Sequence, residues 1–333
     1  MTRRPVPPRV SVVIPCRNEG PYIAPCLDSV LASDYPRERL EILVADGRSS
    51  DGTRSLLVRY AALHPTIVLL DNPRGTTPAG LNVAIRAASG DMVIWMDPHV
   101  LYPPDYIPRL VAGLQESGAD IVSGVLVTVP ADDSPTAQAI AVGLSHRFGV
   151  SNAVPFACYR REIFDRIGMF DEELIRNQDD EFNVRLITRG GRMLLLPDVL
   201  CRYRARRSFR QLARRYYEDG YFKPLVARKA GRVMTVGQLI PAALVGCLSS
   251  SAALALWIPA ARYLFALAAG GYALLVILFA ALAARQHGLR CAAALTLVFP
   301  ILHFSYGSGS LRGIRDHLVA RSAPPQGTLQ LSR

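Results

Sequence analysis

The stretch WMDPHV, residues 95–100, places Asp97 and His99 directly after an apolar run. Carboxylate oxygens suit Mg²⁺ or Mn²⁺, and an imidazole nitrogen suits Mn²⁺ better than Mg²⁺. Two such side chains with one proline between them are compatible with a divalent-cation site. The alternative is an ordinary turn whose histidine lies near an entrance and binds no metal, and the spacing alone leaves both open.

A second carboxylate, Asp46, follows the apolar run of ILVADGRSSDGTR, residues 42–54. A carboxylate at the end of a strand can accept hydrogen bonds from a nucleobase or a ribose. Ser50 or Asp51 can cap the helix that is expected next, which is a structural role. Asp46 itself is also compatible with a plain turn, in which aspartate is common.

Arg74 precedes a loop rich in glycine and threonine that opens a helical pattern. Free N–H groups at a helix N-terminus suit phosphates, and an arginine adds positive charge. The loop is therefore a candidate phosphate site, although glycines there also serve turn geometry alone.

Three acids, Asp179, Asp180 and Glu181, stand together in RNQDDEFNVRL, residues 176–186. One carboxylate of such a cluster can act as a general base on a hydroxyl group. Acids in the first turn of a helix are also favoured by the helix dipole, so this cluster has a structural alternative.

The elements that must position these residues are visible as apolar runs that alternate with helical patterns. This alternation indicates an α/β fold with a mostly parallel sheet covered on both faces. Ligands of such sheets bind at the carboxyl ends of strands, near a topological switch point, which directs attention to Arg17, Asn18, Asp46 and Asp97. The expected strands are 9–16, 41–47, 66–72, 91–97 and 192–200, and the expected helices are 20–33, 52–64, 77–89 and 104–117.

Residues 237–309 differ in character, because charged side chains almost disappear. Three apolar stretches fill this part, and a membrane-spanning helix needs roughly 20 apolar residues. The first two stretches meet this requirement, whereas Pro300 and His303 interrupt the third. We therefore expect two to three membrane helices. A re-entrant or interfacial third segment is one alternative, and buried helices of a soluble protein are another.

The chain carries 38 Lys and Arg against 27 Asp and Glu, a net charge of +11. Basic residues concentrate in 202–232, beside the apolar part, where anionic lipid head groups account for them. No recognised motif for nucleic acid accompanies the charge, so we expect no such partner. The basic flank and the lack of a preceding signal peptide predict an N-terminal part on the cytoplasmic side of the inner membrane. Six cysteines without a CxxC pair fit a reducing compartment.

Four motifs follow one another at the expected strand ends: SVVIPCRNE, EILVADGRSSDGT, NPRGTTPAGLNVAIRAASGD and VIWMDPH. This order resembles the nucleotide-sugar-binding half of family 2 glycosyltransferases, and the resemblance covers about residues 9–200. VADGRSSDGT, WMDPH and RNQDDEFNVRL are closer to the succinoglycan-type glucosyltransferases than to the cellulose synthases. The resemblance implies a Rossmann-like GT-A catalytic domain.

The resemblance implies a donor site at the first two strands. Pro15, Arg17, Asn18 and Glu19 match the motif that lies against the nucleoside, and Asp46 matches the carboxylate that contacts the base. The family's usual second acid after Asp46 is a glycine here, so no role tied to that acid carries over.

The resemblance also implies a cation, Mn²⁺ or Mg²⁺, that neutralises charge on the departing diphosphate. Asp97 matches the first acid of the family's metal motif, and His99 replaces the last. Arg74 is assigned to the nucleotide sugar as well. Gln211 to Arg214 match the Gln-x-x-Arg part of a family element whose next residue, Trp, is Arg215 here. Arg214 is therefore expected at diphosphate or lipid phosphate, with a basic interfacial helix as the alternative.

The acid cluster matches the family's catalytic motif when it is aligned on Arg185. This alignment makes Asp179 the candidate general base, Asp180 the runner-up and Glu181 the later acid. Direct displacement with such a base inverts the configuration of the transferred sugar. Gln178 stands where the family carries glutamate.

Together these features predict a membrane-attached, inverting glycosyltransferase. The resemblance implies transfer of glucose from UDP-glucose to a polyprenyl-diphosphate-linked glycan in exopolysaccharide synthesis. The alternatives are transfer to polyprenyl phosphate itself, a processive polysaccharide synthase, and an inactive nucleotide-sugar-binding scaffold. The expected parts are a basic tail (1–8), the GT-A domain (9–204), a basic interfacial segment (205–236), a transmembrane region (237–309) and a C-terminal tail (310–333).

Overall fold

The computed structural model describes residues 6–146, 148, 156–205, 208–232 and 234–320, so the ends of both expected tails lie outside the described residues. These residues form two compact units. The first unit comprises 6–127 and 156–203, and the second comprises the remaining described residues.

An eight-stranded sheet with the order β3-β2-β1-β4-β7-β6-β8-β5 is the centre of the fold. The strands β3, β2, β1 and β4 run parallel, as the apolar runs predicted. All seven residues of β1 are buried, because both faces of the sheet are covered there. The strands are β1 (Val10–Cys16), β2 (Leu40–Asp46), β3 (Ile67–Asp71), β4 (Met92–Trp95), β5 (Val100–Leu101), β6 (Ile121–Val129), β7 (Cys158–Arg160) and β8 (Met193–Arg204).

The other half of the sheet departs from the parallel pattern. Strand β7 runs antiparallel to both β4 and β6, and β5 runs antiparallel to β8. Strands β5, β6 and β7 were not predicted from the sequence. Strands β5 and β7 have only two and three residues, and Ser123 and Gly124 interrupt the apolar residues of β6.

Four helices follow in the expected order, with ends within two residues of the prediction. They are α1 (Gly20–Leu31), α2 (Thr53–Leu63), α3 (Thr77–Ala87) and α4 (Tyr106–Ser117), and η1 (Arg37–Arg39) is a single 3-10 turn. Two more helices, α6 (Glu162–Ile167) and α7 (Gln178–Thr188), follow β7.

Helix α7, which carries the acid cluster, is anchored by aromatic packing. Phe182 stacks on Phe170 with ring centroids 4.6 Å apart, and Tyr159 meets the edge of Phe182 at 5.7 Å. These rings are buried in the core of the first unit. Such aromatic pairs contribute more to stability than the burial of their area alone. They therefore hold α7, and the acids in its first turn, against the core of the first unit.

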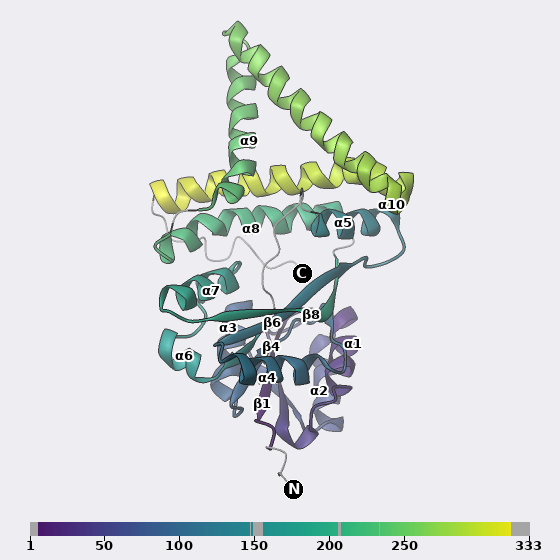
Figure 1. The fold of residues 1–333 in the computed structure, drawn as a ribbon, viewed down its shortest axis with the longest axis vertical. Helices are drawn as coiled ribbons and strands as arrows, with labels where there is room; N and C mark the ends of the chain where they lie inside the picture. The colour runs from purple at the N-terminus through teal and green to yellow at the C-terminus, as the bar shows by residue number, and fades with distance from the viewer. Residues whose placement is uncertain (1–5, 147, 149–155, 206–207, 233, 321–333) are drawn as a thin grey trace. The chain divides into compact units, whose positions relative to one another are not determined.

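The second unit is helical: α5 (Pro135–Ser145), α8 (Phe209–Lys229), α9 (Val236–Leu254), α10 (Pro259–Gly313) and a π-helical turn η2 (Ile314–Val319). Helix α10 is broken at Gly288, whose φ of 80° and ψ of 164° lie outside helical geometry. The loop expected between the second and third apolar stretches is thus reduced to one glycine. Within this unit, α9 and the first arm of α10 form a hairpin, and the second arm runs beside α8 (Figure 1).

Two helices of the described chain are long and apolar enough to span a membrane, α9 and the run 259–319, which includes the break at Gly288. Length and composition alone are weak evidence, but large apolar side chains along these helices are also exposed. On the first arm of α10 they include Tyr263, Leu267, Leu274 and Ile277. An exposed apolar surface of this extent is typical of contact with lipid or a partner.

The second arm of α10 contacts α8 through glycines that leave no room for a side chain. A Cβ on Gly309 would lie 2.1 Å from the carbonyl oxygen of Tyr217, and one on Gly220 would lie 2.1 Å from that of Tyr306. The two backbones therefore touch directly, as small residues allow in helix pairs. The third apolar stretch is consequently held along α8.

We expect Gly309→Ala to disrupt the second unit, because a methyl group would collide with backbone atoms that cannot move aside. Gly270→Ala is the matched control. Gly270 lies on the same helix, and a Cβ there would meet nothing within 4 Å. Thermal unfolding of the purified full chain in detergent should show a lower Tm for Gly309→Ala alone. Equal Tm values for the two variants would contradict this packing.

Candidate nucleotide-sugar site

The first unit brings three predicted strand ends side by side. In the sheet register, Cys16 pairs with Asp46, and Asp46 pairs with Asp71. The loop after β1 is then tied to the loop after β2, because Ser50 N–H donates to Asn18 Oδ1 at 2.8 Å and Asn18 N–H donates to Ser49 Oγ at 2.8 Å. Asn18 takes a positive φ of 55°, which asparagine tolerates better than most residues.

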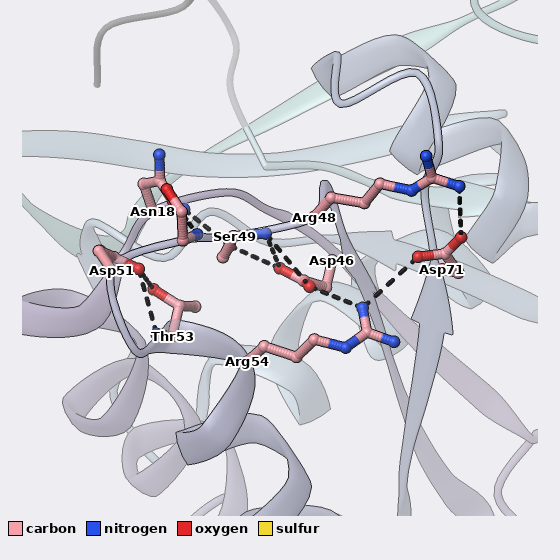
Figure 2. Close-up of polar contacts among 9 residues, drawn as sticks. Asn18, Asp46, Arg48, Ser49, Asp51, Thr53, Arg54 and Asp71 are labelled. Carbon is pink, nitrogen blue, oxygen red and sulfur yellow. Dashed lines mark hydrogen bonds and ion pairs between the residues drawn. The ribbon is translucent and has the colours of Figure 1, made fainter.

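Asp46 is completely buried and lies at the centre of a polar network (Figure 2). Its Oδ1 accepts a hydrogen bond from Ser49 Oγ at 2.6 Å, and its Oδ2 lies 2.9 Å from Arg54 Nη1. The same Arg54 nitrogen lies 3.4 Å from Asp71 Oδ1. A buried carboxylate needs such partners, so Arg54 is part of the site although no motif assigned it.

The motif of residues 15–19, at the end of β1 and in the loop after it, is held by contacts with α2, with α3 and with the loop before α3. Glu19 N–H donates to Thr53 Oγ1 at 2.8 Å, at the start of α2. Arg17 Nη1 reaches the carbonyl of Gly75 at 3.4 Å. Pro15 is buried within β1, where a Cβ on Gly80 of α3 would approach its Cβ to 3.0 Å. These contacts hold the loops after β1, β2 and β3 together.

The Asp97 motif forms a compact turn. Val100 N–H donates to the carbonyl of Asp97 at 3.1 Å, and His99 N–H donates to Asp97 Oδ1 at 2.9 Å. Proline as the second turn residue and aspartate as the first are the types that favour this geometry. Tyr102 accepts a hydrogen bond from Asp97 N–H at 2.8 Å. Burial raises the pKa of the Tyr102 phenol well above its usual value, so this hydroxyl stays neutral.

His99 faces the first-strand motif. Its Nε2 lies 2.9 Å from Glu19 Oε2. Both side chains are buried, at 6% and 1% exposure. The Tyr22 ring lies against the imidazole with centroids 4.3 Å apart. The imidazole therefore connects the turn at Asp97 to the loop after β1.

The residues at this turn fit a divalent cation that is held by the Asp97 carboxylate together with phosphate oxygens of a substrate. Asp97 is a partly exposed carboxylate at a strand end, and cations of this kind are often held by one or two carboxylates together with phosphate oxygens of the substrate. Among the described residues, no three His, Cys, Asp or Glu side chains gather into a ready cation cage. His99 Nε2 is directed at Glu19, so it binds a metal only if that contact is released.

The Glu19–His99 contact can be tested by a double-mutant cycle. Removing one member of a buried polar contact costs about 1–3 kcal/mol, because the other group is left without this partner. We therefore expect Glu19→Gln and His99→Gln each to lower the Tm of the full chain, and the double variant to lose less than the sum.

The same variants separate pairing from metal binding. If the imidazole serves the pairing, the Mn²⁺ concentration that gives half-maximal activity should change alike in both single variants. A change of preferred metal in His99→Gln alone would instead identify His99 as a ligand.

Arg74 is directed at an acid from another part of the chain. Its Nη1 lies 2.5 Å from Glu172 Oε2, and Asn82 Nδ2 of α3 donates to Glu172 Oε1 at 2.8 Å. Asn82 also bonds both backbone groups of Phe170, at 2.9 and 3.0 Å. The loop before α7 is thus fixed to α3. Arg74 is 68% exposed and remains accessible to a phosphate.

The acid cluster occupies the first turn of α7, and its members have different surroundings. Glu181 is buried and forms two hydrogen bonds of 2.8 Å with Arg185, which also bonds the carbonyls of Ile167 and Met169. Asp179 and Asp180 are partly exposed. Burial and the Asp179 carboxylate raise the pKa of Tyr159, so Asp179 lies within electrostatic reach of this residue of β7.

Arg214 lies in the second unit, on α8, and its Nε donates to Glu218 Oε1 at 3.0 Å. Glu218 is buried, so this pair is part of the structure of α8. Sequence reasoning missed Arg54, Glu172 and Tyr22. Arg54 directly follows the second motif, but only the fold brings Glu172 to Arg74 and Tyr22 to His99.

A model of glycosyl transferase family 2 matches residues 11–171. Succinoglycan biosynthesis protein ExoA of Rhizobium meliloti is 32% identical over 222 residues, which cover 63% of this chain and 67% of that protein. The dolichyl N-acetyl-alpha-D-glucosaminyl phosphate 3-beta-D-2,3-diacetamido-2,3-dideoxy-beta-D-glucuronosyltransferase of Methanococcus voltae is 26% identical over 239 residues, covering 66% of this chain and 74% of that one.

Solved structures share the fold. The mannosyltransferase PcManGT from Pyrobaculum calidifontis, solved with GDP-Man and Mn²⁺, is 25% identical with a TM-score of 0.63, covering 94% of this chain and 88% of that one. TarS of S. aureus, solved with UDP-GlcNAc, is 19% identical with a TM-score of 0.50, covering 94% and 92%. The second likeness concerns the fold alone.

Proposed function

Because the chain belongs to glycosyltransferase family 2 and is a nucleotide-sugar-dependent glycosyltransferase, we propose that it transfers one sugar, with inversion, to a polyprenyl-diphosphate-linked glycan in exopolysaccharide synthesis. One observation carries this proposal: Asp46, Asp97 and the acids of α7 lie in a single compact unit, at the strand ends and the helix start where such a fold binds ligands.

In this account the nucleoside lies against Pro15, Arg17 and Asn18, with its base toward Asp46. Arg74 and the start of α3 face the diphosphate. Asp97 holds Mn²⁺ or Mg²⁺ together with phosphate oxygens, and the cation, when bound, neutralises charge on the departing nucleoside diphosphate. The pairing of His99 with Glu19 supports a positioning role for this histidine, which keeps the Asp97 turn in place.

Asp179 is the proposed general base. It accepts the proton of the acceptor hydroxyl while that oxygen attacks the anomeric carbon from the face opposite the leaving diphosphate. The different surroundings of the three acids support this choice. Glu181 is committed to Arg185 and is proposed to hold the helix, and Asp180 remains the alternative base.

A membrane location suits a lipid-linked acceptor. We propose that α9 and the first arm of α10 cross the inner membrane as a hairpin, and that α8 and the second arm of α10 lie at its cytoplasmic surface. The direct glycine packing of the second arm against α8 supports this arrangement over a third crossing. Arg214, on α8, is then placed at head-group level.

The donor sugar follows from resemblance only. The resemblance of the motifs VADGRSSDGT, WMDPH and RNQDDEFNVRL to succinoglycan-type glucosyltransferases supports UDP-glucose, whereas the structure solved with GDP-Man supports a guanosine diphosphate sugar as the second candidate.

A panel of nucleotide sugars tests the proposal. Purified full-length protein with Mn²⁺ or Mg²⁺ should release nucleoside diphosphate from one donor, and chelation of the cation should stop the release. No release from any donor, by folded protein and with both metals supplied, would contradict the enzyme assignment for this site. It would also favour a binding scaffold.

A further inference from the structure

Arg54 and Arg48 form, with two aspartates, a row of alternating charge across the ends of β2 and β3 (Figure 2). Arg48 Nη2 lies 3.5 Å from Asp71 Oδ2, and Arg54 Nη1 lies between Asp71 and Asp46 at 3.4 and 2.9 Å. Arg54 belongs to the first turn of α2, and its side chain turns back toward the strand ends. The proposed function so far gives Arg54 no role.

The exposure of these side chains indicates which group a ligand meets first. The Asp46 side chain is fully buried, whereas those of Arg54 and Asp71 are 46% and 48% exposed. Ser49 Oγ occupies Oδ1 of Asp46, and Arg54 covers Oδ2. Arg54 is the more exposed of the two residues that cover Asp46, so a shift of Arg54 opens Oδ2, which Ser49 N–H also approaches at 3.4 Å, to a ligand group. Because Asp71 lies within 3.4 Å of the same nitrogen, Arg54 can shift toward it without losing an anionic partner.

The position and charge of this row suit a nucleobase better than a phosphate. Two carboxylates repel a diphosphate, whereas a base presents neutral N–H and C=O groups. Strands β2 and β4 both neighbour β1. The strand ends that carry Asp46 and Asp97 are therefore about 10 Å apart, at a spacing of about 4.8 Å per strand. This separation leaves room for a ribose between a base at Asp46 and a diphosphate at Asp97.

We propose that Arg54 and Asp46 together read the pairing edge of the donor nucleobase and select uracil or guanine over cytosine and adenine. This inference rests on the proposed function, because it assumes that a nucleotide sugar binds at these strand ends. Asp46 Oδ2 accepts the ring N–H of the base, and the guanidinium of Arg54, shifted toward Asp71, donates to the adjacent carbonyl oxygen.

The selectivity follows from the arrangement of donors and acceptors on the four bases. Uracil and guanine carry a ring N–H next to a carbonyl, which matches a carboxylate beside a guanidinium. Cytosine and adenine carry an unprotonated ring nitrogen at that position, which faces the buried carboxylate with a lone pair. A site with buried polar groups strongly rejects a ligand that leaves them unpaired.

Binding of four nucleotides that differ only in the base tests this inference. The full chain in detergent, with Mn²⁺ held constant, is titrated calorimetrically with UDP, GDP, CDP and ADP. We expect UDP or GDP to bind at least about 10-fold more tightly than CDP and ADP, because cytosine and adenine leave the buried carboxylate without its hydrogen bond.

Arg54→Met and Arg54→Lys should reduce this preference to less than about 3-fold, because neither side chain has the guanidinium fork. Arg54→Lys leaves a cation at Asp46 and guards against misfolding of the methionine variant. Arg59→Met, an exposed arginine on the same helix, is the matched control and should keep the wild-type preference.

The outcomes separate the inference from the proposed function. Unchanged base preference in both Arg54 variants, or an equal loss of affinity for all four nucleotides, would overturn the role of Arg54. A wild type that prefers CDP or ADP would also overturn it, while leaving the transferase assignment intact. A wild type that binds none of the four would overturn the nucleotide-sugar site and this inference with it.

Discussion

Replacing Asp97 by asparagine should lower the turnover of sugar transfer by about 100- to 1000-fold, the range seen when one group that stabilises transition-state charge is removed. Asparagine keeps the oxygen that accepts the hydrogen bond from His99 N–H, so the turn should persist. It removes the negative charge that holds the cation. Initial rates of nucleoside diphosphate release, measured while Mn²⁺ is titrated, give the result.

A matched control for this variant is Asp198→Asn, which changes an exposed carboxylate that pairs with Arg109 in the same unit. The control should retain wild-type turnover and metal dependence. Full activity of Asp97→Asn at the wild-type Mn²⁺ concentration would show that Asp97 does not hold the cation.

Replacing Asp179 by asparagine should slow the transfer step strongly and leave binding of the donor almost unchanged. Loss of a general base typically costs 10²- to 10⁴-fold in rate, so we expect kcat to fall by about that factor. Affinity for the donor should stay within about 3-fold, because a group needed only for the chemical step contributes little to ground-state binding. Calorimetric titration of the donor and a steady-state assay of transfer provide the two numbers.

The neighbouring acids provide internal controls for Asp179. Asp180→Asn should retain most of the activity, because the carboxylate is not required as a base. Glu181→Gln should lower Tm, because the two hydrogen bonds to Arg185 tie α7 to the segment after α6. If Asp180→Asn loses transfer and Asp179→Asn retains it, the base is Asp180.

The parallel half of the fold could be predicted because its strands are continuous apolar runs and polar side chains follow directly at their ends. Asp46 and Asp97 were located by this rule, and the structure places both where strands β2 and β4 end. The antiparallel strand β7 could not be predicted, because it has three residues and its pairing depends on β4 and β6.

The contacts that define the site were less predictable than its residues. Glu19 and His99 belonged to two separate motifs, and their pairing appears only when β1 and β4 lie side by side. The same holds for Arg74 and Glu172, which are 98 residues apart. The third apolar stretch looked weak because Pro300 and His303 interrupt it, yet it is helical, since α8 packs against its glycines.

The most direct test of the central claim is the transfer of a labelled sugar to lipid. Membranes containing the full chain are incubated with the donor identified in the nucleotide-sugar panel and with Mn²⁺, and the products are extracted into organic solvent. The account predicts a labelled lipid-linked product that releases its glycan on mild acid, is lost in Asp179→Asn and is kept in Asp198→Asn. Nucleoside diphosphate release without any lipid-linked label, or an equal product from Asp179→Asn, would contradict it.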